Sequence, residues 1–233
     1  MLKFRGSQQF RQRIVYSTIS GKPIRIDEIR EESENPGLQE HEAGFLRLVE
    51  KISNGCKIEI NDTGTTMRYR PGLITGGRAI VHDCGTARAI GYYIEPLICL
   101  SLFGKKPLSI TLKGITNDSL DPCVDTLRTV TLPLLKHFGV EEGLDLRITK
   151  RGAPPLGGGE VHLSCPVARK LSAVSWVDGG LVKRIRGVAY STRVSPQNAN
   201  RMVDAARGVL NDLLPDVYIF TDHASGKQAA ASP

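Results

Sequence analysis

Apolar and polar residues alternate with two different periods along the chain, and these periods predict which segments are strands and which are helices. Residues 24–26, 58–60 and 144–148 alternate with a period of two, as strands with one buried face do. Two longer segments repeat every three to four residues, which is typical of amphipathic helices. Their apolar positions are Phe45, Leu46, Val49 and Ile52 in the first, and Val124, Leu127, Val130, Leu134, Leu135 and Phe138 in the second.

Prolines interrupt two of the helical segments. The apolar run 92–103 contains Glu95 and Pro96, which favours a buried helix over a membrane span. Pro133 lies within the second amphipathic pattern. Because an interior proline removes a hydrogen bond and crowds the preceding turn, we expect either helix to kink or restart there.

The same series of segments occurs twice. The first series runs from Gly21, through a helical pattern and a strand near 55–60, to Gly76 and Gly77. The second runs from Gly104, through a helical pattern and a strand near 143–148, to a cluster of three glycines. Strand-like runs follow the clusters at 79–84 and 160–165. Such self-similarity predicts internal repeats at about residues 1–76 and 77–158, with a third beginning at about 159.

The pattern changes after residue 180. A basic strand is predicted at 185–194, a helix begins after the favourable cap Ser195 and Pro196, and a second strand follows at 217–221. We therefore predict a large repeat domain at 1–180 and a partial, smaller α/β domain at 181–223. The tail 224–233 is rich in Ala and Ser and is expected to be disordered.

Composition adds a preference for a polyanionic partner. The chain is 40% hydrophobic and 24% charged, as soluble globular proteins are, and its formal net charge of +7 favours a partner such as RNA. Its five cysteines form no C-x-x-C pair, which argues against disulfides and a zinc site and fits a reducing compartment. The first residues contain no apolar signal segment, so we expect a protein of the cytosol or nucleus.

One glycine-rich segment carries a family resemblance. Residues 151–161, Arg-Gly-Ala-Pro-Pro-Leu-Gly-Gly-Gly-Glu-Val, resemble the signature of RNA 3′-terminal phosphate cyclases. Segments 70–77 and 114–125 resemble other parts of that family. The resemblance implies an α+β fold of repeated units, each with two helices on a four-stranded sheet, as also found in enolpyruvate transferases. It also implies a smaller α/β domain inserted in the third unit.

The opening segment departs from the family pattern. Active cyclases have a Gly-Glu-Gly-Gly-Gly-Gln-type loop before the first helix, whereas this chain has Phe4-Arg5-Gly6-Ser7-Gln8. Phe4 stands at the acidic position, and only Gly6 remains of the glycines that let backbone approach the nucleotide. None of the five histidines matches the nucleophile of the active enzymes. We therefore predict no catalytic residue, no cofactor and no cyclase activity.

The resemblance extends to the ribosome-biogenesis branch of the family. Matching segments are 35–38, 64–66, 91–93, 116–118, 183–187 and 218–223. This implies a nuclear and nucleolar protein of the small-subunit processome that acts in pre-rRNA processing. The implied partners are a processome GTPase, other pre-ribosomal factors and pre-rRNA. No uncharged apolar run is long enough for a membrane span, so no membrane association is expected. Two alternatives stay open: an active ATP-dependent RNA 3′-terminal phosphate cyclase, and a pre-rRNA endonuclease.

Three groups of residues are candidates for anion or RNA binding. The first flanks the altered opening segment, the second is the signature, whose amide groups and guanidinium suit anions, and the third is a basic run before and within the predicted strand. The alternatives for the last two are a tight turn that needs small residues and a solvated strand face. The candidates are Arg11 and Arg13; Arg151, Gly157, Gly158 and Gly159; and Lys183, Arg184 and Arg186. Asp121 and Asp125, four apart at a helix start, are expected to cap that helix.

Overall fold

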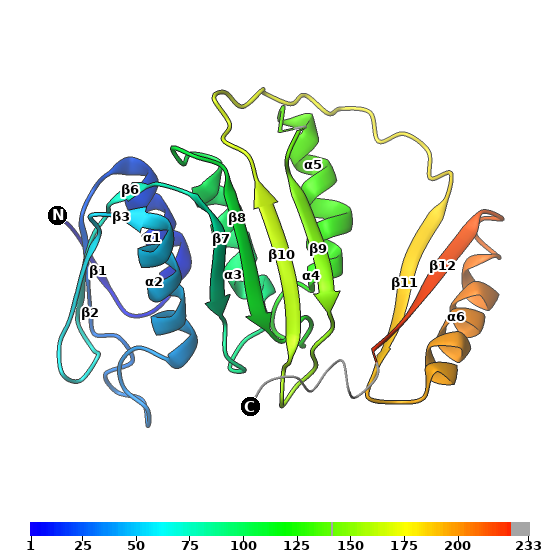
Figure 1. Ribbon diagram of the computed structural model, residues 1–233, viewed down its shortest axis with the longest axis horizontal. Helices are drawn as coiled ribbons and strands as arrows, with labels where there is room; N and C mark the ends of the chain where they lie inside the picture. Colours follow the sequence, from blue (N-terminus) through cyan, green and yellow to red (C-terminus); the bar gives the residue numbers. More distant parts are fainter. Residues whose placement is uncertain (141, 225–233) are drawn as a thin grey trace.

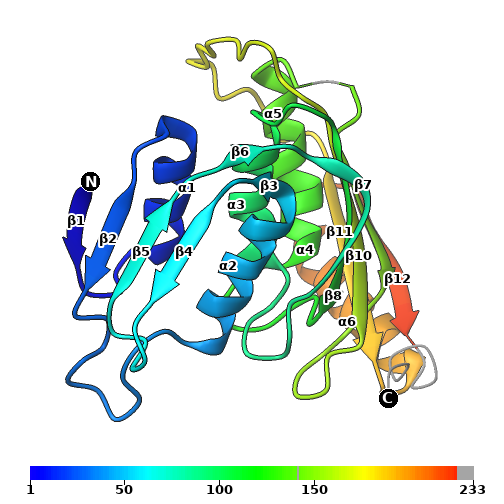
Figure 2. The same ribbon diagram turned by 60° about the vertical axis from the view of Figure 1, so that its left-hand side comes forward.

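The computed structural model describes residues 1–140 and 142–224 and contains two four-stranded sheets with their helices, followed by a smaller unit. Figure 1 shows the two sheet units next to each other and the strand–helix–strand unit at the C-terminal end. In Figure 2, the helices α1, α2 and α3 lie between the two sheets. The outer face of each sheet is therefore turned away from the helices.

The first sheet has the strand order β1-β2-β5-β4. Strand β1 (Leu2–Arg5) is parallel to β2 (Ile24–Asp27), and β5 (Met67–Arg70) is antiparallel to both β2 and β4 (Lys57–Ile60). Helices α1 (Phe10–Ser20) and α2 (Glu40–Ile52) complete this unit. The short strands β3 (Ser53–Asn54) and β6 (Leu73–Ile74) pair with each other.

The second sheet repeats this order and these orientations. Its order is β7-β8-β10-β9, with β7 (Gly77–Asp83) parallel to β8 (Leu108–Gly114). Strand β10 (Gly159–Cys165) is antiparallel to both β8 and β9 (Asp145–Lys150). The two sheets therefore share one topology, and the fold is a mixed α/β arrangement, in agreement with the predicted class.

The position of β10 corrects one predicted boundary. We expected residues from 159 onward to open a third unit, but residues 159–165 form an inner strand of the second sheet. Every second residue of β10 is buried, so one face packs on the helices while both edges pair. An alternating pattern is expected both for the first strand of a new unit and for the last strand of the preceding one. Only the strand pairing shows that β10 belongs to the second unit.

The helices of the second unit are α3 (Gly91–Ser101), α4 (Val124–Thr126), a π-helical turn η1 (Leu127–Thr131) and α5 (Leu132–His137). Helix α3 is mostly buried and continuous through Pro96, so the predicted core helix is confirmed without a restart there. Pro133 opens α5 directly after the π turn. The wider turn accommodates a residue that cannot donate its backbone hydrogen bond.

The π turn changes which side chains of this helix are buried. A π turn contains one residue more than an α-helical turn. The buried side chains Leu127 and Leu132 are therefore five residues apart, instead of the three or four expected for an α-helix. Three members of the predicted apolar stripe are consequently exposed, namely Val130, Leu134 and Phe138. The prediction of a helix was right, but its uninterrupted apolar face was wrong.

The core fills the space between the sheets and the helices. Tyr69, Tyr93 and Phe45 are its largest fully buried side chains. The buried aliphatic side chains of both sheet units belong to the same cluster. The two units are therefore held together by burial of apolar surface.

The C-terminal unit consists of β11 (Ile185–Thr192), α6 (Pro196–Leu210) and β12 (Val217–Ala224). The two strands are parallel, and the oxygen of Ser195 accepts a hydrogen bond from the amide of Gln197, as the predicted cap requires. Residues 166–184 form a long connection without regular structure (Figure 1). Ala224 is the last residue of β12, and the other residues of the predicted tail, 225–233, lie outside the described residues.

Candidate functional site

Arg151 lies at the point where the C-terminal unit meets the second sheet unit. Its Nε donates a 2.6 Å hydrogen bond to Oδ2 of Asp222 on β12. Its Nη1 and Nη2 donate to the two carboxylate oxygens of Asp125 on α4, at 2.7 and 3.1 Å. The guanidinium carbon is 4.4 Å from the ring centre of Tyr190 on β11. One side chain thus connects three elements that are far apart in the sequence.

Burial and charge make this junction strong. The Arg151 side chain is only 4% exposed, and Asp125 is 15% exposed. Burial by itself lowers the pKa of Arg151, but the hydrogen bonds from Asp125 and Asp222 outweigh it and raise that pKa above its usual value. The guanidinium therefore stays charged and faces two carboxylates of its own chain. An outside anion would have to displace them.

Two further contacts join the same units. The amide of Asn117 donates a hydrogen bond to the hydroxyl of Tyr190, and the guanidinium of Arg193 donates to the carbonyl of Gly157 at 3.3 Å. The amide of Thr116 bonds to the carbonyl of Gly152 at 2.9 Å, which fixes the start of the glycine segment against the end of β8. These contacts hold the glycine segment against the C-terminal unit.

The glycines of the signature allow close backbone packing. A Cβ at Gly159 would lie 2.7 Å from the carbonyl oxygen of Gly114, and a Cβ at Gly152 would lie 2.2 Å from the amide nitrogen of Gly159. Gly157 and Gly158 have φ angles of 63° and 81°, which favour glycine. This geometry supports the alternative of a tight turn, because at positions 152 and 159 the space is filled by neighbouring backbone.

A polar pocket of about 210 Å³ lies beside Arg151. Its lining includes Lys150, Asp222 and His223, and the ring of His223 makes a 2.9 Å hydrogen bond with the hydroxyl of Ser191. Arg151 itself is part of the pocket wall. Lys150 is the second cation that a small anion would meet there.

Arg11 and Arg13 point away from each other. Arg11 donates a 2.7 Å hydrogen bond to the carbonyl of Tyr92, pairs with Glu95 at 3.2 Å, and stacks over the Tyr92 ring. Arg13 donates to the carbonyl of Gly6 at 2.7 Å and lies 4.9 Å from the centre of the Phe4 ring. The two arginines line different pockets. They do not converge on one anion position in this structure.

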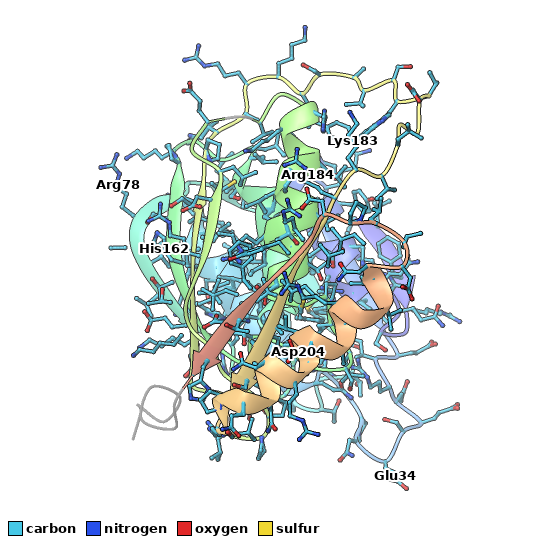
Figure 3. The ribbon with its side chains drawn as sticks, turned by 90° about the vertical axis from the view of Figure 1, so that its right-hand side faces the viewer. Glu34, Arg78, His162, Lys183, Arg184 and Asp204 are labelled. Atoms are coloured by element: carbon cyan, nitrogen blue, oxygen red, sulfur yellow. The ribbon has the colours of Figure 1, made fainter. Side chains whose placement is uncertain are left out.

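Most of the basic residues around the predicted strand 185–194 lie outside the strand of the structure, β11. Lys183 and Arg184 precede β11 and are exposed, and Arg193 follows the strand; among these residues only Arg186 lies within it. Figure 3 shows Lys183 and Arg184 where the long connection approaches β11. Arg186 pairs with Asp216 at 2.8 Å, and this exposed ion pair raises the pKa of Arg186. Lys183 and Arg184 are exposed and form no ion pair with another described residue.

The two aspartates expected to cap a helix have other roles. Asp121 binds Arg88 with two hydrogen bonds of 2.6 and 2.7 Å, and Asp125 binds Arg151. The helix is instead capped by Cys123, whose sulfur accepts from the amide of Thr126. The expectation was wrong because the carboxylates turn toward partly buried Arg88 and buried Arg151.

Sequence reasoning missed a charged cluster around Tyr92. The guanidinium carbons of Arg11 and Arg88 lie 4.1 and 4.9 Å from the centre of its ring, and His41 meets its edge at 5.0 Å. Nearby, Arg30 binds Glu42 through two hydrogen bonds of 2.6 and 2.8 Å. The missed signal is Glu42, a charged residue on the buried side of α2.

The described residues form neither a disulfide nor a metal-type cluster. The five cysteines are free, and within residues 1–140 and 142–224 no three His, Cys, Asp or Glu side chains gather as a metal site would need. In the same residues, no helix combines the length and the apolar character that crossing a membrane requires. The signature arginine, Arg151, is already paired with two carboxylates of the chain.

Comparison with known proteins gives consistent matches to one protein family. A family model described as RNA 3′-terminal phosphate cyclase matches residues 2–228. The chain is 58% identical, over its whole length, to a probable RNA 3′-terminal phosphate cyclase-like protein of Dictyostelium discoideum, and 54% identical to an RNA 3′-terminal phosphate cyclase-like protein of Homo sapiens. It is 47% identical, over 99% of its length, to an rRNA processing protein of Saccharomyces cerevisiae. The chain spans 63%, 62% and 62% of these relatives, respectively.

Proposed function

The chain belongs to the RNA 3′-terminal phosphate cyclase family, and from that premise we propose that it acts in pre-rRNA processing by binding, without cyclising RNA ends. Relatives from two yeasts that are 47% and 50% identical are named rRNA processing proteins. We propose the same process for this chain. The finer proposal is a nucleolar role in small-subunit assembly, with a processome GTPase, other pre-ribosomal factors and pre-rRNA as partners.

The observation that carries the non-catalytic part is the position of Phe4. Its ring packs against the core, and the guanidinium of Arg13 covers it at 4.9 Å. Arg13 is held there by the carbonyl of Gly6, within the segment that active relatives keep rich in glycine. The opening segment therefore presents a covered aromatic ring where an adenylating enzyme needs a carboxylate and open backbone.

The proposal includes an organisation into units. The shared topology of the two sheets supports internal repeats, and the strand–helix–strand unit at 185–224 supports a smaller domain inserted into a third repeat. The Arg151 junction would then connect the repeats to the inserted domain. Of the candidates from the sequence, exposed Lys183 and Arg184 are the ones we propose for contact with pre-rRNA.

A chimera tests the processing role. The 233 residues of this chain would replace the matching part of the Saccharomyces relative, leaving the rest of that relative in place. We expect the chimera to restore growth and normal pre-rRNA intermediates, measured by RNA blotting, after the relative is depleted. A chimera that accumulates normally but leaves precursors unprocessed would contradict the proposal.

The two alternative functions give distinct products with the same chimera. An active cyclase would convert a 3′-phosphorylated oligonucleotide to a 2′,3′-cyclic end and would take up labelled adenylate from ATP. An endonuclease would cut a pre-rRNA fragment at one position in highly purified protein. We expect none of these products, and a robust adenylate adduct would refute the binding-only role.

A further inference from the structure

The outward face of the first sheet carries an unusual row of charges. Across the four strands, the register places Lys3 beside Arg25, Arg25 beside Arg68, and Arg68 beside Glu59. Neighbouring strands lie about 4.8 Å apart, so three cations stand in adjacent positions. Arg70 faces Lys57 in the same way near the edge. Like charges directly opposite each other destabilise a sheet, so fold stability does not explain this row.

The second sheet provides an internal comparison, because it has the same topology. The register there places Asp83 beside Lys113, Lys113 beside Glu160, and Glu160 beside Lys150. Charges alternate strictly along this row, which is the stabilising arrangement. The clustering of cations on the first sheet is therefore a property of its side chains and not a requirement of the topology.

All outward positions of the first sheet are charged. We call this surface the basic sheet face; its cations are Lys3, Arg5, Arg25, Lys57, Arg68 and Arg70, and Asp27 and Glu59 are its acids. Glu28, at the end of β2, pairs with Arg5 at 3.4 Å. Six cations against three carboxylates leave a clear positive excess.

Some cations of this face form no ion pair with another described residue. Arg25 binds Asp27 at 2.7 Å, and Arg68 approaches Glu59 at 3.7 Å. Among residues 1–140 and 142–224, no ion pair is formed by Lys3, Lys57 or Arg70. These three cations lie on β1, β4 and β5, so the unpaired charge extends from one edge of the sheet to the other.

The chemistry of this face favours a nucleic-acid backbone over a protein surface. Stable protein interfaces have an apolar, aromatic centre, whereas the side chains on this face are charged. Most apolar residues of the same strands pack in the core, and the exposed ones, Leu2 and Ile60, lie at strand ends. The same lack of aromatic rings excludes base stacking as the means of binding. What remains is a flat array of Lys and Arg, which suits phosphates that are spaced along an extended chain.

We propose that the basic sheet face binds the phosphate backbone of RNA, without selecting its sequence. The choice of RNA among polyanions rests on the proposed function in pre-rRNA processing. The face is separate from the Arg151 junction, which lies on the other sheet unit. Binding through phosphates releases counterions, so its affinity falls steeply as salt rises.

The test measures binding of a fluorescein-labelled 20-nucleotide single-stranded RNA by anisotropy, between 50 and 200 mM KCl. The face variant is Lys3→Gln/Arg68→Gln/Arg70→Gln in the full 233-residue chain. If each of the three contacts a phosphate, the slope of log K against log salt decreases by about 2. We expect an affinity loss of at least tenfold at 150 mM KCl.

The matched control removes three exposed cations from the strands of the second sheet, all outside the pocket beside Arg151: Arg78→Gln/Lys113→Gln/Arg147→Gln. It has the same net charge as the face variant, so we expect less than a threefold loss. Equal losses in both variants would show that only the overall charge matters and would overturn the proposal. Unchanged affinity in the face variant would do the same.

Two further measurements test whether the face variant is folded and whether the face binds other polyanions. Because the face variant relieves repulsion between like charges, its melting temperature should equal or exceed that of the unchanged chain. If it unfolds instead, the single variant Arg70→Gln serves as the test, with a predicted slope change of about 0.7. Binding of a poly-glutamate peptide in place of RNA, lost in the face variant, would also overturn the proposal.

The result is independent of the processing role. A chimera that processes pre-rRNA normally while the face variant binds RNA unchanged would refute only the surface assigned here. A chimera that fails, with RNA binding lost in the face variant alone, would refute the processing role and leave the surface in place.

Discussion

Replacing Arg151 by Met tests whether this guanidinium holds the C-terminal unit to the second sheet. Methionine keeps a long apolar side chain but removes every donor. The carboxylate of Asp125 then loses two hydrogen bonds, and that of Asp222 loses one. The mostly buried carboxylate of Asp125 thereby loses its closest cation.

The structure sets the expected size of this effect. Removing one partner of a buried ion pair costs about 3–5 kcal/mol. Asp125 keeps 15% exposure and a second cation, Arg128, at 3.6 Å, while Asp222 is half exposed. Water and Arg128 therefore offset part of the loss, which places the expected decrease in unfolding free energy at about 3 kcal/mol.

Urea unfolding monitored by circular dichroism measures this decrease. Arg147→Met is the matched control, since Arg147 lies on the neighbouring strand β9 and is 77% exposed in its pair with Asp145; it should change stability by less than about 0.5 kcal/mol. The double variant Arg151→Met/Asp125→Leu should be more stable than Arg151→Met alone, because no carboxylate of α4 is then left unpaired. A loss below about 1 kcal/mol, or a double variant weaker than the single one, would refute this account.

Two further predictions concern buried groups. His82 is 3% exposed, neither ring nitrogen has a hydrogen-bond partner in the described residues, and burial lowers its pKa from 6.5 to about 4. The unfolded chain therefore binds the proton first as pH falls, so this contribution to stability is complete above pH 6.5 and is lost toward pH 4, by roughly 3 kcal/mol. Urea titrations at several pH values should show that His82→Phe removes this loss while His162→Gln, on the outer sheet face, retains it; an unaltered profile in His82→Phe would contradict the assignment. Gly159→Ala should lower the unfolding free energy by about 1–3 kcal/mol, because its Cβ meets three atoms within 2.8 Å, whereas Gly208→Ala, with open space around it on α6, should raise it by up to about 1 kcal/mol; a neutral Gly159→Ala would rule out the close packing as the reason for this glycine.

Much of the fold was accessible from periodicity. The alternation at 24–26, 58–60 and 144–148 predicted strands that the structure contains, and the stripe from Phe45 to Ile52 predicted α2. These predictions succeeded because one buried face repeats with a fixed period in each type of element. The end of the second unit could not be found in this way, since the pairing of β10 with β8 and β9 depends on hydrogen bonds between distant segments.

The candidate site was accessible only in part. Arg151 was found through the signature, but its partners Asp125 and Asp222 are 26 and 71 residues away, and no local pattern connects them. The sequence also indicated Arg11 and Arg13 as anion-binding candidates beside the opening segment. Two positions apart on a helix, they point to different sides, and each meets a backbone carbonyl.

The two carboxylates that share Arg151 are in different surroundings, and this makes one side of the junction sensitive to ionic strength. Dissolved salt weakens ion pairs that water reaches, such as that with half-exposed Asp222, far more than enclosed ones, such as that with Asp125. Concentrated salt thus loosens the hold on β12 first, while Arg151 keeps its anchor on α4. The C-terminal unit would then depend on the contacts of Tyr190 with Asn117 and Arg151 and of Arg193 with Gly157, while the two sheets, which share an apolar core, would be unaffected.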